Sequence, residues 1–402
     1  MKKVYLDNAS TTQLRPEVIQ EMTKVLTEDF GNPSSTHSFG RNAKSILELS
    51  RKSIAKNLNV SAQEIIFTSC GTEANNWILR SAVRDLKVKR IILSKIEHHA
   101  VLHTVESLQN EYGIQVDYVA VKSNGEIDVT DLVDLLSQET HIKRKISSDE
   151  MKKWVPDNQN LNNSSEEIKT LVSLMHVNNE IGTILNVEKV GRICEQHNAL
   201  FHSDMVQSVG KLEIDLKLIP IDFISASAHK FHGPKGIGFT YVKKNSGLQP
   251  LFFGGEQEKG LRPGTEAVHQ IAGMAKALEL SYTNLESEKN HIQELKNYLI
   301  SQLEIEFPAF EINGTSDGIY TILNILLPFS DAKTAMILFH LDMKGIAVSR
   351  GSACQSGSTR PSHVLAEMLS NEDLKKPSLR ISFSHFNTKE DIDLLIEALK
   401  SV

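Results

Sequence analysis

Two residues of this chain combine a reactive side chain with a position directly after a short apolar run. Lys230 lies in SAHKFHGPKGIGF, before a glycine-rich turn. A lysine amine removed from water loses its proton more easily and becomes a nucleophile that can form a Schiff base. Asp204 also ends an apolar run, and an aspartate there can pair with a protonated pyridine nitrogen. Alone, each has a plainer interpretation as a solvated lysine and a turn aspartate. Lys211 and Lys235 are expected to be solvated.

Residues of neighbouring loops could hold a planar group that carries a phosphate. Gly71 and Thr72 follow an apolar run and open a helix, whose free N–H groups and dipole suit a phosphate. His98 lies in another such loop, where an imidazole could stack on a ring and carry protons. Gln207, three residues after Asp204, could reach a phenolic oxygen of the ring. Because the chain has 15 histidines, a structural role is the plainer expectation for any single one.

A thiol and a guanidinium complete the set of candidates. Cys354 lies in VSRGSACQSGS. A free cysteine is usually buried, but this polar, glycine-rich context predicts an exposed thiol that travels between a buried substrate and an outside acceptor. Cys70, at a strand end, and Cys194, inside a helix, are expected to be structural. Arg380 lies in the strand pattern SLRISFS, from which an arginine could grip an α-carboxylate with two parallel hydrogen bonds. Without the other candidate residues, the plainer interpretation of Arg380 is a surface arginine.

Five short apolar runs predict the strands that position these loops. They lie between amphipathic helices, at residues 65–67, 91–93, 171–177, 200–202 and 223–225. Continuous apolar strands between helices indicate a parallel sheet covered on both faces, and ligands of such sheets lie at the carboxyl ends of the strands. The polar segments CGTEANN, KIEHHA, NNEIG, SDMVQS and SAHK follow the five runs. We therefore expect an α/β fold in which five loops converge on one edge of the sheet.

The change in pattern near residue 287 predicts two domains. We expect a large cofactor-binding domain over residues 14–286 and a smaller α+β domain made of residues 1–13 and 287–402, which carries the cysteine loop. A long helix over about residues 268–299 is expected to link them. Residues 139–168 are polar and predict a mobile surface insertion on the sheet edge away from the site.

Composition excludes several classes of protein. The formal net charge of −6 argues against a dedicated nucleic-acid binder. No apolar run approaches the ~20 residues that span a membrane, and no apolar signal core follows the N-terminal lysines. Three cysteines argue against a disulfide scaffold and favour the reducing cytoplasm. We expect no metal, no nucleic acid and no membrane among the partners.

Eight internal motifs, together with the segments at both ends, resemble one family. From YLDNASTT (5–12) to SLRISF (378–383), the chain is similar to the cysteine desulfurases, fold-type I pyridoxal-phosphate enzymes of the class V aminotransferase group. The motifs between these ends are GNPSSTHSFGR, IIFTSCGTEANN, EHHAVL, MHVNNEIG, HSDMVQSVGKL, SAHKFHGPKGIGF, LRPGTEAVHQIAG and SRGSACQSGSTRPSHVL. The short cysteine loop resembles the subgroup that has SGSAC around the nucleophile. Met205, Cys70 and the length of segment 139–168 depart from the pattern.

The resemblance implies a role for each matching residue. Lys230 would carry pyridoxal 5'-phosphate as a Schiff base, Asp204 would pair with its pyridine nitrogen, and His98 would stack on the ring. The remaining contacts would be made by Asn179 and Gln207 to the ring substituents, by Val206 to the other face, and to the phosphate by Gly71, Thr72, Ser227, His229 and, from the second subunit of a homodimer, Thr265.

The resemblance also implies the reaction. Arg380 would bind the carboxylate of L-cysteine, and Cys354 would attack its sulfur. The products would be L-alanine and a persulfide for an unidentified acceptor protein in iron–sulfur cluster assembly or thio-modification. A selenocysteine lyase, another class V enzyme and a non-enzymatic protein that has kept the fold are the alternatives. The presence of Lys230 and Asp204 argues against the last of these.

Overall fold

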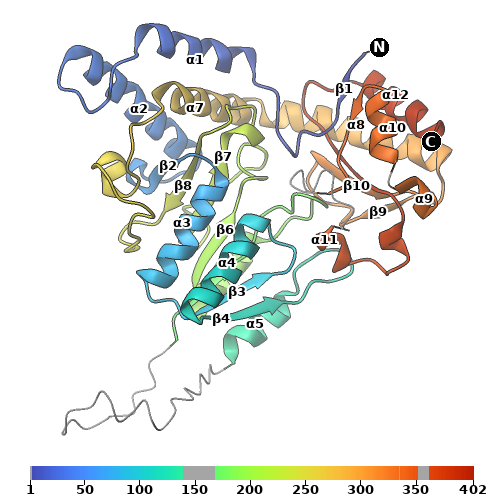
Figure 1. Ribbon diagram of the computed structural model, residues 1–402, viewed down its shortest axis with the longest axis horizontal. Coiled ribbons are helices and arrows are strands. Elements are labelled where there is room, and N and C mark those ends of the chain that lie inside the picture. Colours follow the sequence, from blue (N-terminus) through green and yellow to red (C-terminus); the bar gives the residue numbers. More distant parts are fainter. Residues whose placement is uncertain (1, 139–167, 335, 352–361) are drawn as a thin grey trace.

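The computed structural model describes residues 2–138, 168–334, 336–351 and 362–402. Its centre is a seven-stranded sheet with the strand order β2-β8-β7-β6-β5-β3-β4 (Figure 1). The strands are β2 (Ile65–Thr68), β3 (Arg90–Ser94), β4 (Gln115–Val119), β5 (Thr170–Ser173), β6 (Leu200–Asp204), β7 (Phe223–Ser227) and β8 (Gly238–Val242). Only β8 runs antiparallel to its neighbours; the other pairs are parallel. The predicted α/β class with a mostly parallel sheet is confirmed.

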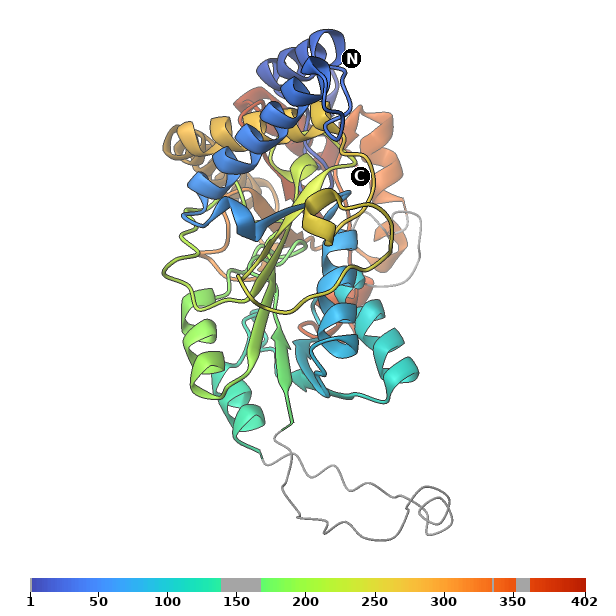
Figure 2. The same cartoon turned by 90° about the vertical axis from the view of Figure 1, so that its left-hand side faces the viewer.

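Helices cover both faces of this sheet, as the edge-on view shows (Figure 2). One face packs against α3 (Gly71–Arg84) and α4 (His99–Tyr112), and the other against α2 (Ser38–Asn57), α5 (Val129–Ser137), α6 (Val187–Gln196) and α7 (Val268–Thr283). Helix α1 (Pro16–Glu28) lies on α7. Successive strand side chains point to opposite faces. Accordingly, Ile91 and Leu93 join one apolar cluster, and Ile92 joins the other.

A second, smaller set of elements packs around its own apolar cluster. It contains the antiparallel sheet β12-β10-β9 and the parallel pair β1-β11. The strands are β1 (Val4–Tyr5), β9 (Glu311–Asn313), β10 (Ile322–Leu326), β11 (Ile346–Ala347) and β12 (Ser378–Ser382); the helices are α8 (Leu285–Glu306), α10 (Ile337–Met343) and α12 (Lys389–Lys400). The short helix α9 (Asp331–Thr334) buries no residue, and α11 (His363–Ala366) packs in a separate small cluster with Ile96 and Ile181. Val4 and Leu6 pack in this cluster with residues of β10, β12 and α12. This shared core supports the proposed division into residues 14–286 and residues 1–13 with 287–402.

The expected long linker helix is instead two helices. Helix α7 ends at Thr283, and α8 begins at Leu285. Asn284 separates them because its ψ of 7° leaves the helical range. Side chains of α7 join the core on the large sheet, and those of α8 join the smaller core. The break therefore lies where the chain passes from one core to the other.

The polar segment 139–168 lies outside the described residues, apart from Ile168. Strand β5 begins directly after it, at Thr170, and runs parallel to β6. Its amino end therefore lies at the edge of the sheet opposite to Asp204, which ends β6. Within the described parts of the chain, no helix is long and apolar enough to cross a membrane.

Candidate active site

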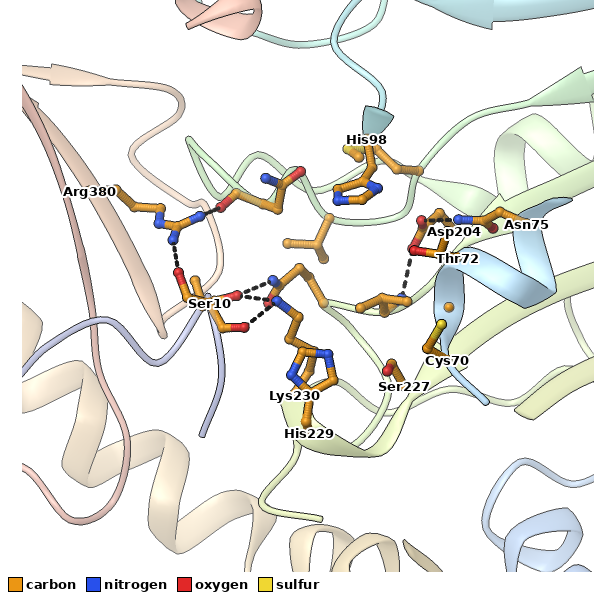
Figure 3. A pocket seen from close by; sticks show the side chains of 17 residues that line it. Ser10, Cys70, Thr72, Asn75, His98, Asp204, Ser227, His229, Lys230 and Arg380 are labelled. Carbon is orange, nitrogen blue, oxygen red and sulfur yellow. Dashed lines mark hydrogen bonds between the residues drawn. The ribbon is translucent and has the colours of Figure 1, made fainter. Parts of the chain in front are cut away.

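A pocket of about 230 Å³ opens at the carboxyl ends of the parallel strands, at the start of α3 (Figure 3). It is lined by Ala9, Ser10, Cys70, Gly71, Thr72, Asn75, His98, Met175, Val177, Asn179, Asp204, Val206, Gln207, Ser227, His229, Lys230 and Arg380. All the predicted site residues line it except two. Thr265 is exposed and does not line it, and Cys354 lies outside the described residues.

The carboxylate of Asp204 is held by two donors. Its Oδ1 accepts from the backbone N–H of Val206 at 3.0 Å, and its Oδ2 accepts from Nδ2 of Asn75 at 2.7 Å. Asp204 and Asn75 are both buried. The carboxylate is thereby fixed in orientation, and a carboxylate has further lone pairs with which to accept a proton donor from a bound ring.

The side chain of Lys230 reaches from η3 (Ala228–Lys230) toward the N-terminal segment (Figure 3). Its Nζ donates to the carbonyl oxygens of Ala9 at 2.6 Å and Ser10 at 2.8 Å. Both of these acceptors are neutral. These two hydrogen bonds hold the amine at the edge of the pocket.

The start of α3 is shaped to receive an anion. The side chain of Cys70 makes no capping hydrogen bond there, so N–H groups of the first turn need another acceptor. A Cβ on Gly71 would lie 2.6 Å from Cγ2 of Val206, so glycine is required. The Oγ of Ser227 is buried and has no hydrogen-bond partner among the described residues. A phosphate would supply acceptors for both the helix and this hydroxyl.

Two histidines of the pocket are held neutral. Burial, helped by the charge of Lys230, lowers the pKa of His229 to about 3. Burial also lowers the pKa of His98, and Lys230 adds to this effect while Asp204 opposes it. The Nδ1 of His98 accepts from the backbone N–H of Ala100 at 3.1 Å, so the proton of the neutral ring lies on Nε2. His98 can therefore stack as a neutral ring and exchange a proton through Nε2.

Arg380 forms the side of the pocket opposite to Asp204 (Figure 3). Its guanidinium is 1% exposed and forms an ion pair with Asp7 at 2.9 Å. It also donates to the hydroxyl of Ser10 at 2.6 Å and to the backbone oxygen of Asn179 at 2.8 Å. The guanidinium plane is therefore fixed, and its buried Nε has no partner in the described structure.

Several side chains that shape the pocket were not assigned to it from the sequence. Asn75 and Ser10 lie inside motifs that were recognised, but nothing in the sequence linked Asn75 to Asp204 or Ser10 to Arg380. Cys70 is half-buried and lines the pocket, a placement that its position at a strand end did not indicate. Cys194 is buried in α6, and burial raises the pKa of its thiol to about 12, which confirms its structural role.

The prediction that Lys211 is solvated is wrong. Lys211 is 8% exposed, and its Nζ donates to Oε1 of Gln207 at 2.8 Å. Burial lowers its pKa to about 7, and the charges of Lys230 and Arg380 add to the effect. A lysine after a polar turn looks solvated in the sequence, and only the packing of residues distant in the chain buries it. Lys235 is exposed, as predicted.

Glu180 connects the pocket with both ends of the segment that contains Cys354. It is fully buried, and its Oε2 accepts a short hydrogen bond from the hydroxyl of Ser362. A Cβ on Gly351 would lie 3.2 Å from the same oxygen. Because the preceding residue, Asn179, lines the pocket, the two flanks of the cysteine segment lie close to it.

The donors and acceptors fit a planar cofactor with a ring nitrogen and a phosphate. The fixed carboxylate of Asp204 suits the nitrogen, and the amine of Lys230 suits a covalent link. The unpartnered hydroxyl of Ser227 and the uncapped start of α3 suit the phosphate. No group of three or more potential metal ligands occurs among the described residues.

Comparisons with known proteins agree with this geometry. The class-V aminotransferase family model matches residues 4–145 and 143–395. A cysteine desulfurase IscS of Clostridium botulinum is 39% identical over 404 aligned positions, covering 100% of this chain and 94% of the relative. A putative cysteine desulfurase IscS 1 of Bacillus subtilis is 39% identical, covering 98% of this chain and 96% of the relative.

Solved structures show the same similarity. A NifS-like protein superposes with a TM-score of 0.85 at 34% identity, covering 100% of this chain and 99% of the other. The structure described as SspA in complex with cysteine has a TM-score of 0.76 at 29% identity, covering 96% and 100% of the two chains. The fold and pocket define a fold-type I protein of the pyridoxal-phosphate-dependent class. The chain belongs to the class V aminotransferase family and, within it, to the cysteine desulfurases.

Proposed function

We propose that this protein is a pyridoxal-phosphate-dependent cysteine desulfurase, which converts L-cysteine to L-alanine and retains the sulfur as a persulfide on Cys354. The observation that carries the proposal is the convergence of Lys230, Asp204 and the uncapped start of α3 on one pocket. An amine, a carboxylate and an anion site in this arrangement match the aldehyde, the ring nitrogen and the phosphate of the cofactor.

The pocket residues bind and orient the reactants. When bound, pyridoxal phosphate supplies an electron sink that weakens bonds at the substrate α-carbon. Asp204, fixed by Asn75, would favour the protonated form of the ring nitrogen. His98 would stack on the ring as a neutral imidazole. Arg380, fixed by Asp7, attracts the substrate carboxylate with its positive charge.

In the sulfur transfer itself, Cys354 is the nucleophile. Its thiolate forms an S–S bond with the substrate sulfur while the Cβ–S bond breaks, and the electron pair of that bond goes to the carbon skeleton. Protons complete this skeleton, which leaves as L-alanine. The net change is L-cysteine plus the Cys354 thiol to L-alanine plus the Cys354 persulfide, and no external oxidant is needed.

The positions of the flanking residues support this role for Cys354. Gly351 and Ser362 both lie against the buried carboxylate of Glu180, next to pocket residue Asn179. A segment of ten residues, 352–361, joins them. The nearness of both flanks to the pocket supports the proposal that Cys354 serves a substrate bound there.

We further propose a homodimer in which Thr265 of one subunit contacts the phosphate held by the other. Thr265 is exposed, although nearby Arg262 pairs with Glu73 of α3 at 2.9 Å. Phe253, which lies before the 3-10 helix η4 (Gln257–Gly260), is 83% exposed, which suits an interface. Sedimentation should show a dimer at assay concentration, and a fully active monomer would contradict the proposal.

The persulfide requires an acceptor, and we propose an acceptor protein of iron–sulfur cluster assembly or thio-modification. The few cysteines of the chain fit a reducing cytoplasm. Segment 139–168 is proposed to play no part in catalysis, because β5 follows it at the edge of the sheet opposite to Asp204. Replacing the segment with a short Gly-Ser turn should leave turnover nearly unchanged; a large loss in a folded variant would contradict this.

The proposal is tested by supplying L-cysteine and a thiol reductant to the protein loaded with pyridoxal phosphate. Alanine and sulfide should form in equal amounts. Conversion of a keto acid without sulfide would instead indicate an aminotransferase, and selenide release without sulfide release would indicate a selenocysteine lyase. Absence of any cofactor-dependent turnover would overturn the proposed function.

A further inference from the structure

Lys211 and Gln207 form a buried pair on the pocket side of the turn that follows β6. Gln207 is 4% exposed and lines the pocket, whereas Lys211 lies behind it. Gly210 lets the chain turn back at this point: its φ is +74°, and a Cβ there would lie 2.8 Å from Cβ of Phe231. The turn therefore places the Lys211 amine against the amide of Gln207.

The neighbours of Gln207 dictate which way its amide points. Its Oε1 accepts from Lys211 Nζ at 2.8 Å, and its Nε2 donates to the backbone oxygen of Ala9 at 2.9 Å. A carbonyl oxygen can only accept, and a lysine ammonium can only donate. If the amide were flipped, its carbonyl oxygen would face the carbonyl oxygen of Ala9, and its NH2 group would face the ammonium of Lys211. The bond from Lys211 to Oε1 thus helps to keep Nε2 directed toward Ala9, which lines the pocket.

Lys211 has no carboxylate partner within ion-pair distance in the described part of the chain. Its pKa is lowered to about 7 by burial and by the charges of Lys230 and Arg380. The charged or titratable groups near it are Lys230 of η3, Arg380 of β12, His229 and His232 at the end of η3, and Glu288 of α8, which shares a small cavity with it. A buried amine without an ion pair costs free energy, so its retention needs a reason.

We propose that Lys211 is a positioning residue for the cofactor, which acts by fixing the amide of Gln207 so that its N–H faces the oxygen substituent of the ring. This proposal rests on the proposed function, because it assumes the cofactor in this pocket. A second consequence concerns Lys230. The positive charge of Lys211 repels a proton on the nitrogen of Lys230, so it favours the unprotonated form of that nitrogen.

Two variants separate the hydrogen bond from the charge. Lys211→Met keeps the length of the side chain but removes both. Lys211→Gln removes the charge and keeps an N–H donor for Gln207. Lys296→Met is the matched control: Lys296 is 6% exposed, burial lowers its pKa to about 8, and its Nζ donates to the backbone oxygen of Ile319 at 3.1 Å, away from the pocket residues.

The experiment titrates each apoprotein with pyridoxal phosphate and then follows the visible absorption of the bound cofactor against pH. Lys211→Met should bind the cofactor about tenfold more weakly, since loss of a donor to a buried carbonyl has an effect of this size. Its spectral pH midpoint should rise by about half a unit, because a repelling charge is gone. Lys211→Gln should bind within about threefold of the parent but show the same rise. Lys296→Met should change neither quantity.

Equal weakening in Lys211→Gln and Lys211→Met would overturn the role of the hydrogen bond, and an unmoved midpoint in both would overturn the role of the charge. Parental affinity in Lys211→Met would overturn the proposal as a whole. If Lys211→Met does not fold, Lys211→Gln still decides: a loss of affinity well beyond threefold contradicts the proposal. Failure of the parent protein to bind pyridoxal phosphate would refute the proposed function instead.

Discussion

The two sides of the pocket are built in different ways. The floor, defined here as Gly71, Asn75, Asp204, Ser227 and Lys230, comes from the ends of strands β6 and β7 and from the helices α3 and η3 that follow strands of the large sheet. The far wall, defined as Asp7, Ser10, Ser349 and Arg380, joins the two ends of the chain; the hydrogen bond between Arg380 and Asp7 spans 373 positions. In the proposed reaction the floor would hold the cofactor, whereas the far wall would bind the substrate carboxylate through Arg380.

If the floor binds the cofactor, loss of the Lys230 amine should have the largest effect of any substitution. Lys230→Ala should abolish turnover and leave no cofactor that borohydride can fix to the protein, because no other lysine lines the pocket within the described residues. Absorption spectra and mass spectrometry after borohydride treatment measure this. Lys235→Ala is the control, since Lys235 is exposed. Cofactor fixed to the Lys230→Ala variant would show that the assignment is wrong.

Acid pH should lower the stability of the protein through His202, which lies in the strand that ends at Asp204 of the floor. His202, in β6 next to the strand end at Asp204, has its pKa lowered by burial to about 3, compared with about 6.5 in an unfolded chain. Between these values only the unfolded chain binds the proton, so stability falls as the pH drops below about 6.5. At pH 5 the loss from this residue is about 2 kcal/mol.

Denaturant unfolding of the apoprotein at pH 7 and pH 5 checks this pH dependence. His202→Gln should lose less stability over the interval than the parent protein. An equal loss in the two proteins would mean that His202 is not the group that binds the proton on unfolding.

The link between the far wall and the cysteine segment can be weakened separately from the floor. Glu180→Gln removes the charge of the acceptor of the Ser362 hydroxyl, so transfer of sulfur to Cys354 should slow by about tenfold. Cofactor affinity and spectrum should stay unchanged, because Glu180 does not line the pocket. Rapid-quench measurement of persulfide formation tests this. Glu367→Gln, which loses only a partly exposed pairing with Lys95 at 3.5 Å, is the control.

The smallest expected effect comes from removing one hydrogen bond between two floor residues. Asn75→Ala removes the side-chain donor to Asp204 Oδ2, so cofactor affinity should fall about fivefold, as for one lost hydrogen bond of ~1 kcal/mol. Asn76→Ala is the matched control, since the Asn76 side chain bonds only to the backbone of its own helix, at Thr72. Equal effects of the two substitutions would show that the contact with Asp204 does not matter.

The same contrast explains what the sequence could predict. Strand ends place polar residues at one edge of a sheet, so the sequence alone suffices to assign Lys230, Asp204 and Gly71 to one pocket. The contacts of Asn75 with Asp204 and of Ser10 with Arg380 depend on packing between segments distant in the chain, which no local pattern encodes. Because packing between distant segments also buries Lys211, the sequence predicted wrongly that this lysine is solvated.

The same limit applies to the elements of the fold. Strand β8 (GFTYV) begins with a glycine that reads as part of a turn, and β4 (QVDYV) alternates without a long apolar run, so neither was predicted. In contrast, helical spacing is a local signal: Ile392, Leu395, Ile396 and Leu399 follow this spacing in the sequence and form the buried face of α12.

The central claim is that the cofactor floor serves a sulfur transfer to Cys354. One turnover with L-cysteine carrying radioactive sulfur, without reductant, tests it most directly. Peptide mapping should place the label on the peptide that contains Cys354, with one alanine released for each labelled site. Cys354→Ser should retain the bound cofactor but take up no label, and Cys70→Ala should label normally. Label on Cys70 or Cys194, or full sulfide release by Cys354→Ser, would contradict the account.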